Sequence, residues 1–296
     1  MTLKGGIEAG IPIEDIVYKT KPELAIELLD EIIANDIKFG WITADGLYGQ
    51  SYEFCKAIDE RRLKFIVDIH KNQHVYLEEP QIFIPERKSN KGRKPSRKVI
   101  NQESIEVQAY MKTLTNSSFL KIKVRKGTKG WVKVKAHKKQ VWVWDHQEDQ
   151  ARQRTLIITK GGDVKYMLSN DIDEKKRLQD YVFMGSQRYF IERAFGDGKG
   201  ELGLGDYQIR KYRSWYHHQA LIMMAMNYVL ETKIKYKSPL PLLSVRDVRM
   251  QIIAELKHQG VHIEKEIDQM LTRHKIRYKD IMRYYKNEDY FDQILT

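Results

Sequence analysis

KFGWITADGLYGQSYEFCKAIDERRLKFIVDIH, residues 38–70, is the stretch that decides the fold class. Residues 38–45 are apolar and β-branched enough for a buried strand, and residues 64–70 repeat this composition after the helix-like segment 51–63. A strand–helix–strand order implies parallel neighbouring strands, because the crossover helix returns the chain to the same end of the sheet. The stretch therefore predicts an α/β fold with its site at the carboxyl ends of these strands.

An acid ends the first of these strands. Asp45 precedes the turn GLYGQ, which exposes its carboxylate at the end of the sheet. The same position is typical of a helix cap, so both interpretations of Asp45 stay open. Asp68, on the second strand, has no glycine turn after it and has cationic neighbours that can pair with it: Lys64, His70 and Lys71. Asp45 is therefore the stronger site candidate.

Upstream, residues 20–37 predict an amphipathic helix. Thr20 and Glu23 form a capping box at its start. Its wide apolar face predicts packing against a sheet, and consists of Leu24, Ile26, Leu28, Leu29, Ile32 and Ile33. Residues 6–20 show neither a helix nor a strand period.

Downstream, the run RKSNKGRKPSRK, residues 87–98, predicts a loop. It is either simply solvated or a phosphate clamp, with Arg93 and Lys94 as candidate DNA contacts. Short segments then alternate apolar and polar residues, as antiparallel strands with one wet face do: 104–110, 119–126, 130–137, 140–146 and 155–160. The wet face is rich in lysine. Trp131, Trp142 and Trp144 either pack in a core or stack on unpaired bases.

RYFIERAFGDGKGELGLGDYQIRKYRSWYHH, residues 188–218, carries the second candidate acid. On a continuous helix, Arg188, Glu192 and Lys199 fall along one stripe. An acid between two cations suits a metal ion beside a phosphate, whereas the alternative is an ordinary surface salt bridge. The glycines between residues 196 and 205 disfavour a plain helix, so something other than helix stability accounts for them.

The C-terminal part predicts helices. Residues 219–231, QALIMMAMNYVLE, are apolar nearly all round and predict a buried helix whose methionines are core. Pro239 and Pro241 break the chain, and the remainder predicts amphipathic helices that form a helical cap or a dimer contact.

Composition points to a polyanionic partner. The net charge is +12 and the pI is near 9.4. Nucleic acid is favoured over a membrane as the partner, because the sequence has no long apolar run. A basic protein without such a partner is the alternative. A single cysteine, Cys55, excludes an internal disulfide and a cysteine-based zinc site. No signal peptide is visible, which predicts an intracellular protein.

Two motifs resemble one family. Arg188, Glu192 and Lys199 have the spacing of the arginine–glutamate–lysine signature of DDE-type insertion-sequence transposases, although Gly185 stands where that signature has tyrosine. The continuation GELGLGDYQIRKYRSWYHH resembles the segment that follows the signature in one bacterial branch. ADGLYGQ resembles the second aspartate motif of that branch, in which an acid ends a central strand of a ribonuclease-H-like sheet.

The resemblance implies an incomplete ribonuclease-H-like core, with a β-rich insertion between the second and third acidic positions and a C-terminal helical region. The expected domains are a partial core (1–80), a basic loop and β-rich insertion (81–168), returning core helices with the glutamate motif (169–235) and the C-terminal helical region (236–296). Family members have a first acid on a strand well upstream of the second. No strand-borne acid precedes Asp45 here, so we expect a chain truncated at its N-terminus.

The chemistry implied is metal-assisted DNA cleavage and strand transfer. Asp45 and Glu192 would be catalytic ligands of Mg²⁺ or Mn²⁺, which activates water or a 3′-hydroxyl for attack on a phosphodiester. The expected phosphate contacts are Arg188, Lys199, Arg210 and Arg213. With two acidic ligands of three, activity should be impaired or absent. The alternative is a nonenzymatic DNA-binding or dimerising fragment. The expected partners are transposon-end and target DNA, and a second copy of the chain, in the bacterial cytoplasm at the nucleoid.

Overall fold

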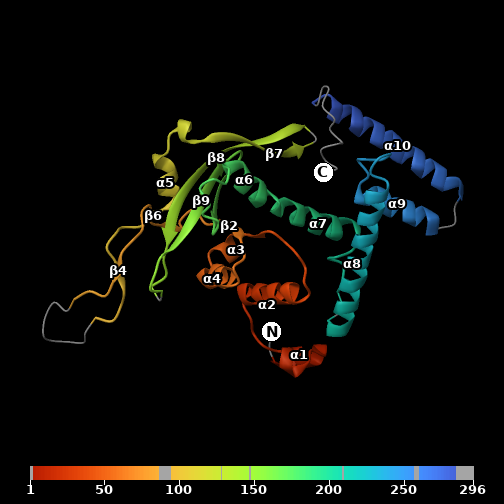
Figure 1. Ribbon diagram of the computed structural model, residues 1–296. Coiled ribbons are helices and arrows are strands. Elements are labelled where there is room, and N and C mark those ends of the chain that lie inside the picture. The colour runs from red at the N-terminus through yellow and green to blue at the C-terminus, as the bar shows by residue number, and fades with distance from the viewer. Residues whose placement is uncertain are drawn as a thin grey trace. The chain divides into compact units, whose positions relative to one another are not determined.

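The computed structural model describes residues 3–86, 95–127, 129–146, 148–208, 210–256 and 260–284, which form a mixed α/β fold as predicted (Figure 1). The chain divides into two compact units. We call Lys19–Arg125 with Trp131–Arg188 the sheet unit, and Met1–Tyr18 with Lys126–Gly130 and Tyr189–Thr296 the helical unit.

One mixed sheet with strand order β1-β2-β10-β9-β8-β7 forms the centre of the sheet unit. Its strands are β1 (Ile42–Ala44), β2 (Phe65–Ile69), β7 (Leu120–Gly127), β8 (Gly130–Val143), β9 (Arg152–Lys160) and β10 (Val164–Ser169). The predicted parallel pairing of β1 with β2 is confirmed, although β1 is shorter than the expected 38–45. β10 pairs antiparallel with β2 and β9, and β8 with β9. The predicted strands 119–126 and 155–160 are confirmed as β7 and β9, whereas the two predicted strands 130–137 and 140–146 are one strand, β8.

Two small sheets extend this unit. β3 (His74–Val75) pairs with β6 (Ile105–Glu106), and β4 (Ile82–Phe83) with β5 (Val99–Ile100). The predicted strand 104–110 is wrong beyond Glu106, because the chain turns there into α5 (Val107–Thr113). Backbone N–H groups of Val107 and Gln108 donate to carbonyls of residues 73 and 71, so the first turn of α5 is held by tertiary hydrogen bonds.

Besides α5 and a short 3-10 helix (Asn116–Ser118), the described part of this unit contains the helices α2 (Lys21–Ala34), α3 (Gly46–Gly49), α4 (Tyr52–Glu60) and α6 (Leu178–Ser186). The capping box of α2 is confirmed, since the backbone N–H of Thr20 donates to Glu23 at 2.6 Å and that of Glu23 donates to the Thr20 hydroxyl at 3.4 Å. The expectation that its wide apolar face lies on a sheet is wrong. Only one edge of α2 packs inward, around Leu29, while Leu28 is 57% exposed.

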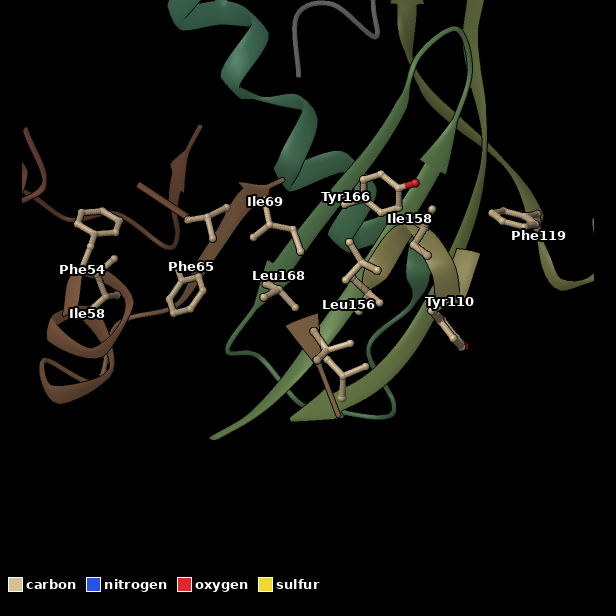
Figure 2. Packing of buried hydrophobic residues seen from close by; sticks show 14 of the residues in the cluster. Phe54, Ile58, Phe65, Ile69, Tyr110, Phe119, Leu156, Ile158, Tyr166 and Leu168 are labelled. Atoms are coloured by element: carbon tan, nitrogen blue, oxygen red, sulfur yellow. The ribbon is translucent and has the colours of Figure 1, made fainter. Parts of the chain in front are cut away.

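Alternate strand residues pack on opposite faces of the sheet. Figure 2 shows one face, where Phe54 and Ile58 of α4 gather with strand side chains: Phe65, Ile69, Leu156, Ile158, Tyr166 and Leu168. On the other face α6 packs Tyr181 and Val182 against Ile66 of β2, Ile157 of β9 and Met167 of β10. Full burial of each large apolar side chain contributes about 1.5–3 kcal/mol, so both faces hold β2 in place.

The helical unit contains α1 (Leu3–Ala9), a short 3-10 helix (Ile13–Asp15), α8 (Tyr212–Lys235), α9 (Val245–Leu256), α10 (Gly260–Met282) and, from its second residue, α7 (Arg188–Glu201). α1 contradicts the expectation of no helix in residues 6–20. The hydrophobic core of the helical unit contains Val229, Leu243, Val245 and Val248.

The predicted full burial of residues 219–231 is also wrong. Within α8 only Ile222 and Val229 are buried, whereas Leu221 is 63% and Met224 69% exposed. Apolar composition does not supply a partner for every side of a helix, and α8 has buried contacts along one side only. In the described part of the chain, no helix is long and apolar enough to cross a membrane.

Candidate active site

The register of two parallel strands brings two aspartates to the same end of the sheet. Ala44 of β1 lies opposite Val67 of β2, and Asp45 and Asp68 are the next residues along the two strands. Neighbouring parallel strands keep such residues beside each other, at the edge where open α/β sheets hold their sites. The sequence predicted this position for Asp45 and favoured it over Asp68.

Asp45 also caps the turn that follows it. Its Oδ1 accepts a hydrogen bond from the backbone N–H of Leu47 at 3.0 Å, which makes it the N-cap of α3. The capping interpretation of Asp45 is therefore confirmed. Because the residue is exposed and a carboxylate has two oxygens, the cap is compatible with a further ligand on the same side chain.

The glycines of the GLYG turn are required by close packing. A Cβ at Gly49 would lie 2.0 Å from the carbonyl oxygen of Asp68, and a Cβ at Gly46 would lie 2.9 Å from Cδ2 of His70. The α3 turn thus rests directly on the end of β2. This packing keeps Asp45, its cap and the β2 end in one rigid group.

Asp68 is half-buried and ion-paired. Nη2 of Arg188, the first residue of α7, lies 3.2 Å from its Oδ2. Burial raises the pKa of Asp68, the charges of Arg188 and Lys165 lower it, and the charge of Asp45 raises it, with a net shift above the ordinary value. The expected pairing of Asp68 with Lys64 is wrong, since Lys64 pairs with Asp171 at 3.1 Å. An ion pair between residues far apart in sequence leaves no local signal.

A hollow of about 640 Å³ opens beside Asp68, entirely within the sheet unit. Its lining residues are Asp68, Ile69, His70, Lys71, Asn72, Val164, Lys165, Tyr166 and Arg188. Three of these side chains are cations, so the hollow suits an anionic ligand such as a phosphate. Sequence reasoning missed Lys165, because a lone lysine in a short strand carries no motif.

Gly185, which stands where the transposase signature has tyrosine, lies where α6 crosses the sheet. A Cβ there would be 2.5 Å from Sδ of Met167 and 3.5 Å from Cδ1 of Ile66. The departure from the signature therefore follows from close packing of α6 on β10 and β2 in this chain.

Arg188, Glu192 and Lys199 all lie on α7, so the continuous helix that their common stripe requires is present although the glycines disfavour it. Both side chains are exposed. Two glycines of this stretch are needed for different structural reasons. Gly198 is buried, and a Cβ there would be 3.2 Å from Leu204, whereas Gly203 has φ +79° and ends the helix in the left-handed region.

The GELGL…WYHH segment is held together inside the helical unit. His218 of α8 is hydrogen-bonded through Nε2 to the carbonyl oxygen of Gly203 at 3.0 Å, and its ring stacks on Tyr207 at 5.0 Å between centroids. His218 therefore fixes the turn after α7. Among the predicted phosphate contacts, Arg210 and Arg213 are exposed near the start of α8, while Arg93 and Lys94 lie outside the described residues.

The predicted metal ligands belong to different units, Asp45 to the sheet unit and Glu192 to the helical unit, and their joint site stays a prediction. Their carboxylate oxygens suit Mg²⁺ or Mn²⁺ rather than zinc. Among the residues that the structure describes, no group of three or more His, Cys, Asp or Glu side chains could hold a metal ion. The donors therefore fit magnesium in type but number two.

Comparisons with known proteins agree with the family that the motifs resemble, and the family match covers Asp45 but ends before Glu192. Residues 8–131 match the model of the family described as DDE superfamily endonuclease. A probable transposase for insertion sequence element IS701 from Microchaete diplosiphon is 41% identical over 61 residues, which are 20% of this chain. The matched residues cover 16% of the length of that relative. These findings confirm the resemblance to DDE-type insertion-sequence transposases.

Proposed function

We propose that this chain, as a relative of the DDE-type insertion-sequence transposases, performs metal-assisted DNA cleavage and strand transfer, and that its activity is weak. The observation that carries the proposal is the exposed Asp45 at the carboxyl end of β1, in register with Asp68 and part of one rigid group with the β2 end. The cationic hollow beside Asp68 supports it, because a scissile DNA strand must be held by its phosphates.

The proposed fold is a ribonuclease-H-like core. Parallel β1 and β2 with α4 between them belong to that core, and the antiparallel strands β7 to β9 belong to a β-rich insertion between Asp45 and Glu192. α7 follows the insertion in the chain and carries Glu192. This order supports the assignment of Asp45 and Glu192 as second and third acids.

The roles of the side chains follow from their charge. Asp45 and Glu192 would hold Mg²⁺, which when bound activates the attacking oxygen and stabilises the leaving one. Lys199, Arg210 and Arg213 would bind DNA phosphates. Arg188 engages the Asp68 carboxylate in an ion pair, which leaves Asp45 as the acid of this sheet edge that is open to the metal. Two acidic metal ligands hold the ion less tightly than three, which is the reason to expect weak activity.

Nicking of supercoiled plasmid DNA with Mg²⁺ tests the proposal. The wild-type chain should nick slowly, and Asp45→Asn and Glu192→Gln should each remove the nicking. Glu264→Gln, which neutralises an exposed acid on α10, serves as the matched control and should nick as the wild type does. Nicking that survives Glu192→Gln would indicate an unrelated nuclease. DNA binding without any nicking by the wild type would favour the nonenzymatic DNA-binding fragment.

A further inference from the structure

The outer strands of the sheet carry lysines on one face. Ile122 and Val124 of β7, and Val134 and Ala136 of β8, pack into the cluster on the α6 side of the sheet. Successive strand residues point to opposite faces, so the residues between them face away from α6. These are Lys121 and Lys123 on β7 and Lys133 and Lys135 on β8, and all are exposed. We call these four residues the lysine face.

Among the described residues, the strands around the lysine face carry no opposing charge. The residues that make up β7, β8, β9 and β10 include neither aspartate nor glutamate. Within the described part of the chain, no carboxylate forms an ion pair with the four lysines. Lys135 also lies directly opposite Lys160 of β9 in the antiparallel register. Like charges directly opposite each other destabilise a sheet, so this arrangement costs stability unless an anion neutralises it.

Aromatic rings hold one ammonium group of the lysine face, that of Lys123, and the neighbouring one of Lys160 in place. Nζ of Lys123 lies 5.2 Å from the ring centroid of Trp131, and Nζ of Lys160 lies 4.0 Å from that of Phe119. Such cation–π contacts reduce the freedom of a long side chain without consuming its charge. A positive surface that is ordered and open to solvent is suited to a repeating anion. In this proposal the Trp131 ring positions Lys123 and does not stack on bases.

We propose that the lysine face binds the phosphate backbone of duplex DNA, away from the cleavage site. The inference rests on the proposed function, which makes DNA the polyanion that this chain meets. Lysines recur at every second residue, about 6.8 Å apart along a strand, on adjacent strands. Contacts of this kind hold DNA without reading its sequence. The face would therefore supply affinity and orientation, and leave recognition of sequence to other residues.

Fluorescence anisotropy with a fluorescein-labelled duplex of arbitrary sequence tests this proposal. The face variant replaces Lys121, Lys123, Lys133 and Lys135 with glutamine. The control variant makes the same change in net charge at exposed lysines of α2, α10 and the loop before α6: Lys21, Lys175, Lys265 and Lys275. A third variant carries arginine at the four positions of the lysine face, and should retain wild-type affinity because the charge is kept.

The face variant should bind the duplex at least about tenfold more weakly than wild type, and the slope of log affinity against log salt should flatten by roughly one for each phosphate that is no longer neutralised. Its melting temperature should equal or exceed that of wild type, because the repulsion is relieved. Equal weakening in the face and control variants would overturn the proposal. So would weakening that is seen with an RNA duplex and not with DNA. The anisotropy is measured without Mg²⁺ and the nicking with it, so a failure of the cleavage proposal is distinguished from a failure of this one.

Discussion

Gly49 allows the α3 turn to approach the end of β2. A Cβ at this position would lie 2.0 Å from the backbone oxygen of Asp68, and a backbone atom cannot move aside without shifting the strand. We expect Gly49→Ala to lower the free energy of unfolding by about 3 kcal/mol, the upper part of the range for overpacking. Urea denaturation followed by tryptophan fluorescence measures this change.

Gly196 supplies the matched control for that substitution. It lies inside α7, and a Cβ there would meet nothing within 4 Å. Gly196→Ala should therefore raise stability by about 0.5–1 kcal/mol, because alanine loses less conformational entropy in a helix. Equal effects of the two alanines would contradict the close approach of α3 to β2.

The Arg188–Asp68 ion pair predicts a coupling between distant positions. We expect Arg188→Gln and Asp68→Asn to be non-additive in a double-mutant cycle, with an interaction free energy of about 1–2 kcal/mol. The direction in which the stability of the fold changes with pH follows from the raised pKa of Asp68. A carboxyl whose pKa is raised by folding stabilises the fold below its unfolded pKa and loses this contribution as pH rises through the folded value.

Arg188→Gln removes a cation that lowers the pKa of Asp68, so the pKa should rise further and the loss of stability on raising the pH should be larger than in wild type. Carboxyl carbon NMR, compared between Arg188→Gln and wild type, reads the pKa directly. An unchanged pKa would show that the two side chains do not interact in solution.

The start of α9 is fixed by a buried acid. Asp247 is 5% exposed, accepts hydrogen bonds from the backbone N–H and hydroxyl of Ser244, and pairs with Arg273 and Arg277 of α10 at 3.3 and 3.1 Å. Burial raises the pKa of Asp247, but the hydrogen bonds from Ser244 and Arg277 outweigh it, and the net shift is downward. Asp247 thus connects the cap of α9 to the neighbouring helix.

Asp247→Asn should cost about 2 kcal/mol near neutral pH, since buried charge-assisted hydrogen bonds are lost. A lowered folded pKa means that the contribution is present above the unfolded pKa and is lost as pH falls through the folded value. The difference from wild type in urea denaturation should therefore shrink as the pH falls below the ordinary range of a carboxyl. Asp268→Asn, an exposed acid on α10, is the control and should change little at either pH.

Helices and strands were predictable where the signal was local. The Thr20–Glu23 capping box and the apolar run of β2 lie within a few residues, and both were found in the sequence. The segment 104–110 was misassigned, because tertiary hydrogen bonds to residues 71 and 73 start α5 in place of a longer strand. The burial of residues 219–231 was not predictable either, because it depends on packing partners that cannot be identified from the composition of the helix.

The candidate site divides in the same way. Asp45 was predictable because the strand, the acid and the glycine turn are contiguous. The Arg188–Asp68 pair, the position of Lys165 and the reason for Gly185 depend on contacts between distant segments, so no local pattern could reveal them.

The division of the chain into two units leads to a prediction about metal binding. One proposed Mg²⁺ ligand, Asp45, belongs to the sheet unit and the other, Glu192, to the helical unit. An ion held by both carboxylates binds the folded chain and not the unfolded one, so it stabilises the fold by RT ln(1 + [Mg²⁺]/Kd). At a concentration ten times Kd this is about 1.4 kcal/mol.

Thermal unfolding with MgCl₂, against NaCl of equal ionic strength, measures this contribution. We expect a rise in melting temperature that Asp45→Asn and Glu192→Gln each remove, with no further effect in the double variant, because one site needs both ligands. Since only two acids are proposed to hold the ion, the rise should require millimolar magnesium, on the order of the weak sites of flexible carboxylates. A rise that persists in the double variant would assign the stabilisation to other acids and remove the metal site from positions 45 and 192.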